Sequence, residues 1–333
     1  RDDVESRGLG DVYKRQDTSY AICKSMGKEL AGFADIFEEA DLDMLVLLGD
    51  RFEIQMAAVA AMLYRIPVAH IHGGELTQGL MDDAIRHSVT KMSDLHFTST
   101  SEYAQRVIQM GEQPERVFCV GALGIENIKS IRLLSREQLC QKFGDIFLHN
   151  YIMVTYHPVT LEKHTAGIQF QKLLNVVENH PEYHYIFTYA NADTDGAIIN
   201  KMIESYTQEH KNTKAFVSMG QLGYLSALQY CSAVLGNSSS GIIEAPSFHI
   251  PTINIGDRQK GRVRAKTVID CGYETRDIEQ ALTESQNQKF KDLCQESTNP
   301  YEGKNTSEQI IMQIKKYLNQ VQGKQKIFYD IEV

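Results

Sequence analysis

Short apolar runs alternate with helical segments along most of this chain, and that alternation constrains the fold more than any other feature. In the first half, segments with helical periodicity separate four apolar runs of strand length, at 45–48, 67–71, 95–98 and 117–120. Strands that alternate with helices at short intervals pair in parallel, because each return to the sheet requires a crossover connection. The sequence therefore predicts an α/β protein with parallel sheets.

The alternation stops at about residue 129 and restarts near Asn150, which indicates two domains. The second series contains five predicted strands, at 151–156, 185–189, 215–217, 233–235 and 252–255. At 333 residues, the chain is long enough for two domains of ordinary size. We predict Rossmann-like domains over 17–149 and 150–303 that face each other across a cleft. A C-terminal helix and tail over 304–333 are expected to pack back on the first domain.

The composition argues against several partners. A formal charge of −9 disfavours nucleic acid, whose binding needs bulk positive charge. No apolar run approaches the roughly 18 residues of a membrane span, and no signal peptide opens the sequence. The six cysteines include no CxxC pair, which suits reduced thiols. We expect a cytoplasmic protein without nucleic-acid or membrane partners. Residues 1–16 are polar and lack apolar periodicity, so we expect a non-native or disordered tail there.

Charged side chains end two neighbouring strands of the first predicted domain. Asp50 follows the first run, and His70, His72 and Glu75 lie at the end of the second. Ligands bind at this carboxyl edge in open parallel sheets. We expect His70 and His72 on one face of the strand, and Gly73–Gly74 to let the backbone approach a ligand closely. The two histidines could bind zinc, but no third ligand has a suitable spacing, so we predict no metal site.

Asp82 and Asp83 open the next predicted helix, and Arg86 and His87 follow one turn later. Pairing at i,i+3 or i,i+4 explains some of these charges without any function. Asp50 could likewise serve only as a helix N-cap. Adjacent residues on a helix point in different directions, so at most one of the two aspartates faces a ligand.

The second predicted domain carries a different kind of site. His157 follows its first strand, and a serine-rich turn at 236–241 joins a later strand to a helix. Free backbone amides and hydroxyls at such a turn can hold an anion. A carboxylate one turn into the helix could bind both hydroxyls of a ribose, and two arginines after the next strand add positive charge. The candidate ligand-binding residues are Ser238, Ser239, Ser240, Gly241, Glu244, Arg258 and Arg262.

Together these motifs resemble the hydrolysing UDP-N-acetylglucosamine 2-epimerase family, in its sialic-acid or nonulosonate branch. The matching stretches are GDRFE, HIHGGE, DDAIRHSVTKMSDLHF, VIQMGE, YHPVT, GNSSSGIIEAPSF and NPYEGKN. They occur in order from about residue 18 to the C-terminus. The resemblance implies a GT-B-type fold, in which the second domain holds the nucleotide and the first carries the sugar chemistry.

The implied reaction converts UDP-N-acetylglucosamine and water into N-acetylmannosamine and UDP, without a cofactor. A base removes the C2 proton as UDP departs, and water then adds to the 2-acetamidoglucal intermediate, so two acid/base groups are needed. The resemblance assigns proton transfer to Asp50, Glu75 and either Asp82 or Asp83, with His72 as an alternate. It makes His157 a hydrogen-bond donor to the glycosidic or phosphate oxygen. We expect a homo-oligomer, either a dimer or a tetramer.

Two features depart from the family pattern. Members normally begin with a strand and a TG[ST]RA[DE][YF]G-like loop, which has no match here. We therefore expect an incomplete N-terminal domain, which would leave the chain inactive or less stable. Some relatives carry Glu at the position of His72, where it is implicated in proton transfer at C2. The sequence leaves open whether His72 or Glu75 is the base here.

Other activities are also compatible with these motifs. The same chemistry could act on a UDP-2,4-diacetamido-trideoxyhexose, as in legionaminic-acid synthesis. A non-hydrolysing 2-epimerase is disfavoured, because that branch carries HxEAGLR where this chain has HxHGGE. A glycosyltransferase of the same fold would transfer the sugar to an acceptor. A catalytically silent nucleotide-sugar-binding protein is the alternative that is not an enzyme.

Overall fold

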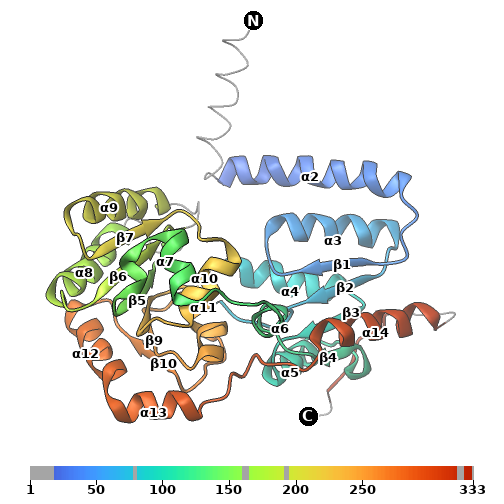
Figure 1. The fold of residues 1–333 in the computed structure, drawn as a ribbon. Coiled ribbons are helices and arrows are strands. Elements are labelled where there is room, and N and C mark those ends of the chain that lie inside the picture. The colour runs from blue at the N-terminus through green and yellow to red at the C-terminus, as the bar shows by residue number, and fades with distance from the viewer. Residues whose placement is uncertain (1–18, 78–80, 160–164, 191–194, 321–325, 332–333) are drawn as a thin grey trace, which may run out of the picture. The chain divides into compact units, whose positions relative to one another are not determined.

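The computed structural model describes residues 19–77, 81–159, 165–190, 195–320 and 326–331, and the predicted tail at 1–16 lies outside them. The described residues form two compact units (Figure 1). The first contains 19–75, 81–119 and the residues from 309 onward, and the second contains 76–77 and 120–308. Within these ranges, no helix has the length and apolar character that crossing a membrane requires.

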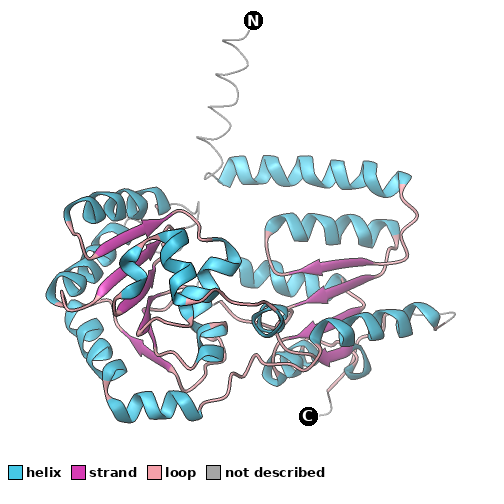
Figure 2. Ribbon diagram, viewed as in Figure 1, coloured by secondary structure: helices cyan, strands magenta, loops and turns pink. Residues whose placement is uncertain are grey.

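The first unit is built on a parallel sheet with the strand order β1-β2-β3-β4 (Figure 2). Its strands are β1 (Leu45–Leu48), β2 (Val68–Ile71), β3 (Leu95–Thr98) and β4 (Val117–Cys119). Leu48 pairs with Ile71, and Ile71 pairs with Phe97, so β1, β2 and β3 end at nearly the same level. The loops that follow these three strands therefore share one edge of the sheet.

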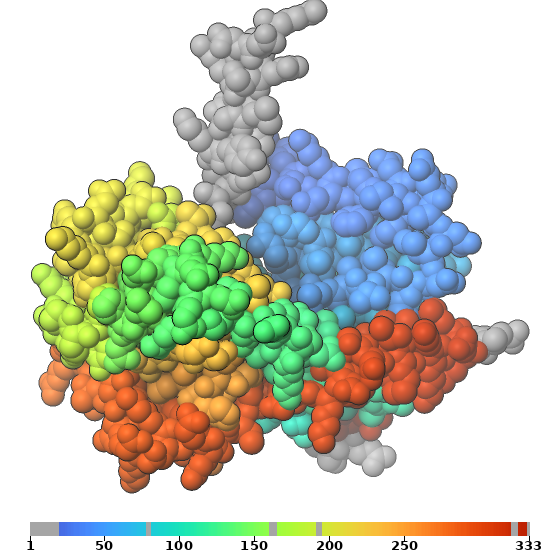
Figure 3. Space-filling model, viewed as in Figure 1, coloured from blue at the N-terminus to red at the C-terminus, as the bar shows by residue number. Residues whose placement is uncertain are grey.

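Alanines let one helix pack closely on this sheet. The helices of the unit are α2 (Ser19–Glu39), α3 (Phe52–Tyr64), α4 (Asp82–Met92), α5 (Ser101–Gln109), the 3₁₀ helix η1 (Pro114–Arg116) and the later turns of α14 (Thr306–Asn319). Four alanines of α3 (Ala57, Ala58, Ala60 and Ala61) are buried together with Leu47 and Val68 of the sheet. On α14, drawn in red in Figure 3, Tyr317 is buried beneath the guanidinium of Arg116, 5.9 Å from its ring centre.

The second unit contains a six-stranded parallel sheet with the order β10-β9-β8-β5-β6-β7. The strands are β5 (Tyr151–Thr155), β6 (His184–Thr188), β7 (Thr213–Phe216), β8 (Ala233–Gly236), β9 (Thr252–Ile255) and β10 (Val268–Cys271). The chain builds outward from β5 through β6 and β7, then returns to β8 on the other side of β5. This reversal makes the gap between the ends of β5 and β8 a topological switch point, where α/β sheets bind ligands.

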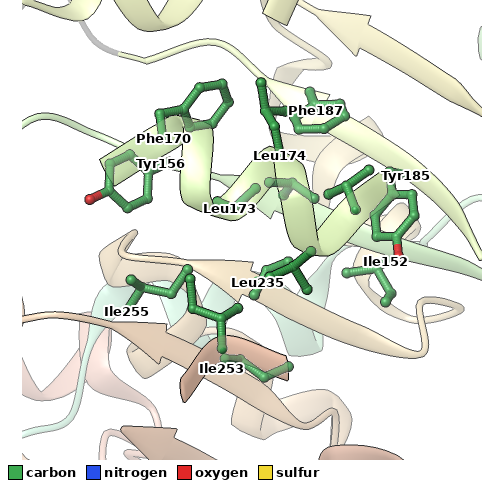
Figure 4. Packing of buried hydrophobic residues seen from close by; sticks show 14 of the residues in the cluster. Ile152, Tyr156, Phe170, Leu173, Leu174, Tyr185, Phe187, Leu235, Ile253 and Ile255 are labelled. Atoms are coloured by element: carbon green, nitrogen blue, oxygen red, sulfur yellow. The ribbon is translucent and has the colours of Figure 1, made fainter. Parts of the chain in front are cut away.

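Both faces of this second sheet are buried. Ile152 and Val154 of β5 pack in a cluster with α8 (Ala166–Asn179), α9 (Gly196–Glu209) and α12 (Thr275–Gln286), part of which Figure 4 shows. Tyr151 and Met153 pack on the opposite face with α7 (Arg136–Phe143), the 3₁₀ helix η2 (Asp145–Leu148) and α10 (Gly220–Leu228). The remaining helices are α6 (Leu123–Ser130), α11 (Ser239–Ile243), η3 (Ala245–Phe248) and α13 (Gln288–Glu296).

The predicted α/β class with parallel sheets in two domains is confirmed. Two elements, α6 and β10, were not predicted from the sequence. β10 is a partly exposed edge strand containing Asp270, so it lacks a continuous apolar run. The long continuous segment of the second unit also begins at Val120, before the boundary expected near Asn150. The reason is that Leu139 of α7 and Phe147 of η2 are buried in the same cluster as Tyr151, so this stretch is part of the second core.

Candidate functional site

In the first unit, the loops after β1, β2 and β3 bring several predicted site residues together with a buried arginine. Arg86 of α4 has a side chain only 1% exposed, and one of its nitrogens donates to the carboxylate of Asp50. Its other terminal nitrogen donates to Asp83 Oδ1 at 2.6 Å and to the Glu75 carbonyl oxygen at 2.7 Å. One guanidinium thus ties the loop after β1, the loop after β2 and the first turn of α4 to each other.

This arrangement fixes two carboxylates at the sheet edge. The side chains of Asp50 and Asp83 are 27% and 22% exposed, and each carboxylate is paired with Arg86. Charge-assisted hydrogen bonds to a guanidinium are strong and directional. Asp82, the first residue of α4, lies at the end of the helix where the macrodipole favours a negative charge.

His72 and Glu75 form a second pair in the same unit. His72 Nδ1 lies 2.8 Å from Glu75 Oε1, and the Ser99 hydroxyl after β3 donates to the same oxygen at 2.9 Å. Glu75 has a side chain only 5% exposed, whereas that of His72 is 19% exposed. A carboxylate on one ring nitrogen of a histidine fixes the tautomer and leaves the other nitrogen available for proton transfer.

His70 does not share the environment of His72, contrary to the expectation that both lie on one face. His70 is fully buried; Nε2 lies 2.9 Å from the Gly49 carbonyl oxygen and Nδ1 3.2 Å from the Thr90 hydroxyl. His72 lies beyond the end of β2 with φ of 69°, so strand alternation no longer applies to it. Burial lowers the pKa of His70 to about 3, which keeps it neutral.

Gly73 and Gly74, which lie between His72 and Glu75, also have structural roles. Gly74 has φ of 78°, and a Cβ there would collide with the carbonyl oxygen of Tyr103 on α5. Arg106 of α5 donates to the carbonyl oxygen of Gly74, which holds the loop against that helix. Gly74 therefore makes a close approach to α5 within the fold, whereas a Cβ on Gly73 would meet the side chains of His70 and Thr90. Among the described residues, no three His, Cys, Asp or Glu side chains are grouped as a metal site would require.

The second unit has a pocket of about 330 Å³ at the carboxyl ends of its strands. It is lined by His157 after β5, Thr188 at the end of β6, Gln221 and Tyr224 of α10, and Ser238 and Ser240 after β8. Ser238 is the N-cap of α11, and its hydroxyl accepts a hydrogen bond from the Ser240 amide at 3.3 Å. The pocket therefore occupies the topological switch point between β5 and β8.

Asn237 is the residue that ties this pocket together. Its side-chain oxygen accepts from the His157 amide at 2.7 Å, and its side-chain nitrogen donates to the His157 carbonyl oxygen at 2.8 Å. Its own carbonyl oxygen accepts from Arg258 at 3.2 Å and from Gln259 at 2.9 Å. The loops after β5, β8 and β9 are thereby fixed relative to one another.

The pocket presents hydroxyls and a neutral imidazole. Burial, assisted by the nearby Arg258 guanidinium, lowers the pKa of His157 to about 3, so one ring nitrogen donates and the other accepts near pH 7. Burial raises the pKa of the Glu244 carboxyl at the end of α11, and Ser240 partly offsets this. Ser239, Gly241, Glu244, Arg258 and Arg262 are not among the described residues that line the 330 Å³ pocket.

Sequence reasoning did not identify several of the residues that organise these sites. The i,i+3 pairing of Asp83 with Arg86 was visible in the sequence, but the contacts of Arg86 with Asp50 and Glu75 were not. Ser99 and Arg106 gave no signal, and Asn237 was part of the serine-rich turn without a role of its own, because each acts through a partner at least 24 residues away, as for Ser99 and Glu75.

Comparisons with known proteins identify the family of this chain. A family model described as UDP-N-acetylglucosamine 2-epimerase matches residues 11–315. The chain is 42% identical over 311 residues to polysialic acid biosynthesis protein P7 of Escherichia coli, covering 93% of this chain and 79% of that protein. It is 41% identical over 276 residues to GDP/UDP-N,N'-diacetylbacillosamine 2-epimerase (hydrolyzing) of Campylobacter jejuni, covering 83% of this chain and 71% of that one.

A solved structure shares the fold. The UDP-GlcNAc 2-epimerase of Neisseria meningitidis bound to UDP-GlcNAc aligns with a TM-score of 0.77 and 20% identity, covering 91% of this chain and 83% of that chain. At this identity the likeness concerns the fold, which is GT-B-like with two parallel-sheet domains.

Proposed function

This chain belongs to the UDP-N-acetylglucosamine 2-epimerase family, and we propose that it is a hydrolysing member that converts UDP-N-acetylglucosamine and water into N-acetylmannosamine and UDP. The observation that carries this proposal is the edge of the first sheet, where Arg86 braces Asp50 and Asp83 close to the His72–Glu75 pair. Several acid/base groups in fixed positions suit a reaction that moves a proton off a carbon and back onto it.

The reaction proceeds in two steps. In the first, a base takes the C2 proton while the bond from C1 to the UDP oxygen breaks, which gives 2-acetamidoglucal and UDP. In the second, water adds its hydroxyl to C1 and a proton is delivered to C2 from the opposite face. We assign these transfers to Asp50, Glu75 and either Asp82 or Asp83, with His72 as the alternate base. The His72–Glu75 hydrogen bond supports treating these two residues as one proton-transfer unit.

The second unit supplies the binding half of the proposal. Ser238, Ser239, Ser240 and Gly241 hold the diphosphate, Glu244 holds the ribose, and Arg258 and Arg262 add positive charge. The His157 ring, neutral near pH 7, donates a hydrogen bond to the glycosidic or phosphate oxygen as UDP leaves. No metal has a role in these steps. We further propose a cytoplasmic homo-oligomer that acts in sialic-acid or related nonulosonate synthesis.

A second candidate substrate is a UDP-2,4-diacetamido-trideoxyhexose. The observation that favours it is the 41% identity to the Campylobacter enzyme, whose name states that it acts on diacetylbacillosamine nucleotides. Both candidates require the same chemistry at C1 and C2, and they differ in the substituents at C4 and C6.

The test is to incubate the protein in D₂O with each UDP-sugar and follow the products by NMR. Free N-acetylmannosamine carrying deuterium at C2, with release of UDP, supports the proposal. Preferred turnover of the diacetamido sugar selects the second substrate. An intact UDP-sugar with deuterium at C2 would make the protein a non-hydrolysing epimerase, and binding without exchange at C2 would make it a binding protein only.

A further inference from the structure

The C-terminal residues 326–331, here called the strap, lie against the first unit and contact the sequence Gly111-Glu112-Gln113 after α5. The Tyr329 amide donates to the Gly111 carbonyl oxygen at 2.9 Å. The Gln113 side chain donates to the Ile327 carbonyl oxygen at 3.3 Å. Gly111 and Glu112 end the VIQMGE stretch, a motif of the sequence to which the proposed chemistry assigns no role.

Gly111 is shaped to receive the strap. It has φ of 86°, a conformation that favours glycine, and a Cβ at this position would overlap the ring of Phe328. The outer side of Phe328 remains open to solvent, and the Lys91 ammonium lies 4.9 Å from its ring centre. The ring of Phe328 therefore packs on the backbone of Gly111, at a position where any larger residue would overlap the ring.

Lys326 makes the most extensive contacts of the strap. Its ammonium lies 2.8 Å from Glu112 Oε2, and it donates to the carbonyl oxygens of Lys91 at 2.8 Å and Ser93 at 2.6 Å. It also lies 3.4 Å from the Thr90 carbonyl oxygen. These carbonyls belong to the last turn and the C-cap of α4, where helix carbonyls lack intrahelical partners. A lysine there satisfies them and complements the negative end of the helix dipole.

Glu112, the acidic partner of Lys326, is buried within the first unit. Its side chain is 2% exposed and also accepts from His96 Nε2 at 2.9 Å and Lys91 Nζ at 2.5 Å. Burial by itself raises the pKa of Glu112, but hydrogen bonds from His96, Lys326 and Lys91 outweigh it and lower the pKa to about 2. Glu112 is therefore an anion at neutral pH, and Lys326 is one of the cations that balance it.

We propose that the strap fixes α4 in place, and that Lys326 is a positioning residue for the site at the other end of this helix. The first half of α4 carries Asp82, Asp83 and Arg86, so a displacement of the helix moves the carboxylates that Arg86 braces. The functional half of this inference rests on the proposed epimerase activity, whereas the anchoring of α4 does not.

The experiment compares the full chain with Lys326→Met, which keeps an apolar stem and removes the charge. Lys315→Met, on the exposed side of α14, is the matched control. Hydrogen–deuterium exchange is measured for peptides covering α4, together with kcat and KM for the UDP-sugar and the Kd for UDP. We expect about 10-fold faster exchange in the last turn of α4 and kcat about 10-fold lower, because small misplacements of catalytic groups are costly. The Kd for UDP, which reports on the second unit, should stay within about 2-fold.

The readouts separate the possible failures. Exchange in α4 that matches the Lys315→Met control would overturn the anchoring, and faster exchange with unchanged kcat would overturn the positioning role. Phe328→Ala removes a different contact of the strap and should also make exchange in α4 faster. This second variant keeps the test decisive if Lys326→Met does not fold. If the unmodified chain turns over no UDP-sugar, the proposed function fails, and α4 exchange still decides whether the strap anchors the helix.

Discussion

The two candidate regions of this protein lie at equivalent places in their sheets but contain opposite kinds of chemistry. In the first unit, the loops after the strands carry carboxylates and a histidine around the buried guanidinium of Arg86. In the second unit, they carry serine hydroxyls, a neutral His157 and Asn237, whose side chain pairs with the backbone of His157. Charged groups held in place suit proton transfer, and uncharged donors suit the binding of an anion.

The comparison also shows how each region is kept rigid. Arg86 joins three segments through ionic hydrogen bonds, so the first site depends on a buried charge. Asn237 joins three loops through its side-chain amide and its backbone carbonyl oxygen, which also accepts from the Arg258 guanidinium, so the hydrogen bonds of the second site centre on a residue that does not titrate. Neutralising a carboxylate of the first region should therefore lower turnover, whereas changes in the second region should lower the affinity for UDP.

The strongest test of this division is Asp50→Asn. The amide retains the shape of Asp50 and a hydrogen-bond acceptor toward Arg86, but it cannot take a proton. We expect turnover to fall by about 100-fold or more, the range that a general acid or base contributes. Calorimetry should give an unchanged Kd for UDP. Retained activity would remove Asp50 from the mechanism, and weakened UDP binding would break the division between the two regions.

The next test concerns pH, because each region contains a histidine whose pKa burial lowers to about 3. Unfolded histidine titrates near 6.5, so below that pH the unfolded chain binds protons that the folded chain does not. As the pH falls from about 6.5 to about 3, His70 and His157 should each lower the free energy of unfolding by about 1.4 kcal/mol per pH unit.

Urea unfolding at pH 7 and pH 5.5 measures this loss. His70→Asn and His157→Asn should each reduce the difference between the two pH values, while the exposed His149→Asn serves as the control. If one of the two variants leaves the pH dependence unchanged, the histidine that it replaces is not held neutral in the folded protein. The two regions would then differ in the charge state of their buried histidines.

A smaller effect is expected for Glu244→Ala in the second region. A hydrogen bond from a ribose hydroxyl to a carboxylate contributes about 1.5–3 kcal/mol, so the Kd for UDP should rise about 10-fold or more. Binding of UDP by calorimetry is the measurement, and Glu284→Ala, at an exposed position of α12, is a matched control. An unchanged Kd would place the ribose elsewhere.

The smallest expected effect is that of EDTA, which should leave turnover unchanged. Both ring nitrogens of His70 are already engaged, by the Gly49 carbonyl oxygen and the Thr90 hydroxyl, so His70 and His72 cannot ligate one metal in this arrangement. Activity that EDTA abolishes and zinc or magnesium restores would contradict this, and it would change the first region from a proton-transfer site to a metal site.

The sequence by itself determined the class of fold and the segments that carry chemistry. The period of the apolar runs is a local property, so β1, β2, β5 and β8 could be located before any contact was known. The motifs after these strands could be placed at the sheet edges for the same reason, since a parallel sheet brings its carboxyl ends together.

Only the tertiary structure decided which of these residues act on one another. The separation of His70 from His72 depends on a positive φ beyond the end of β2, and the role of Arg86 depends on Asp50, 36 residues away. The strap contacts α4 across more than 230 residues, as between Lys326 and Lys91. Such contacts are set by the packing of whole elements, which leaves no periodic trace in the sequence.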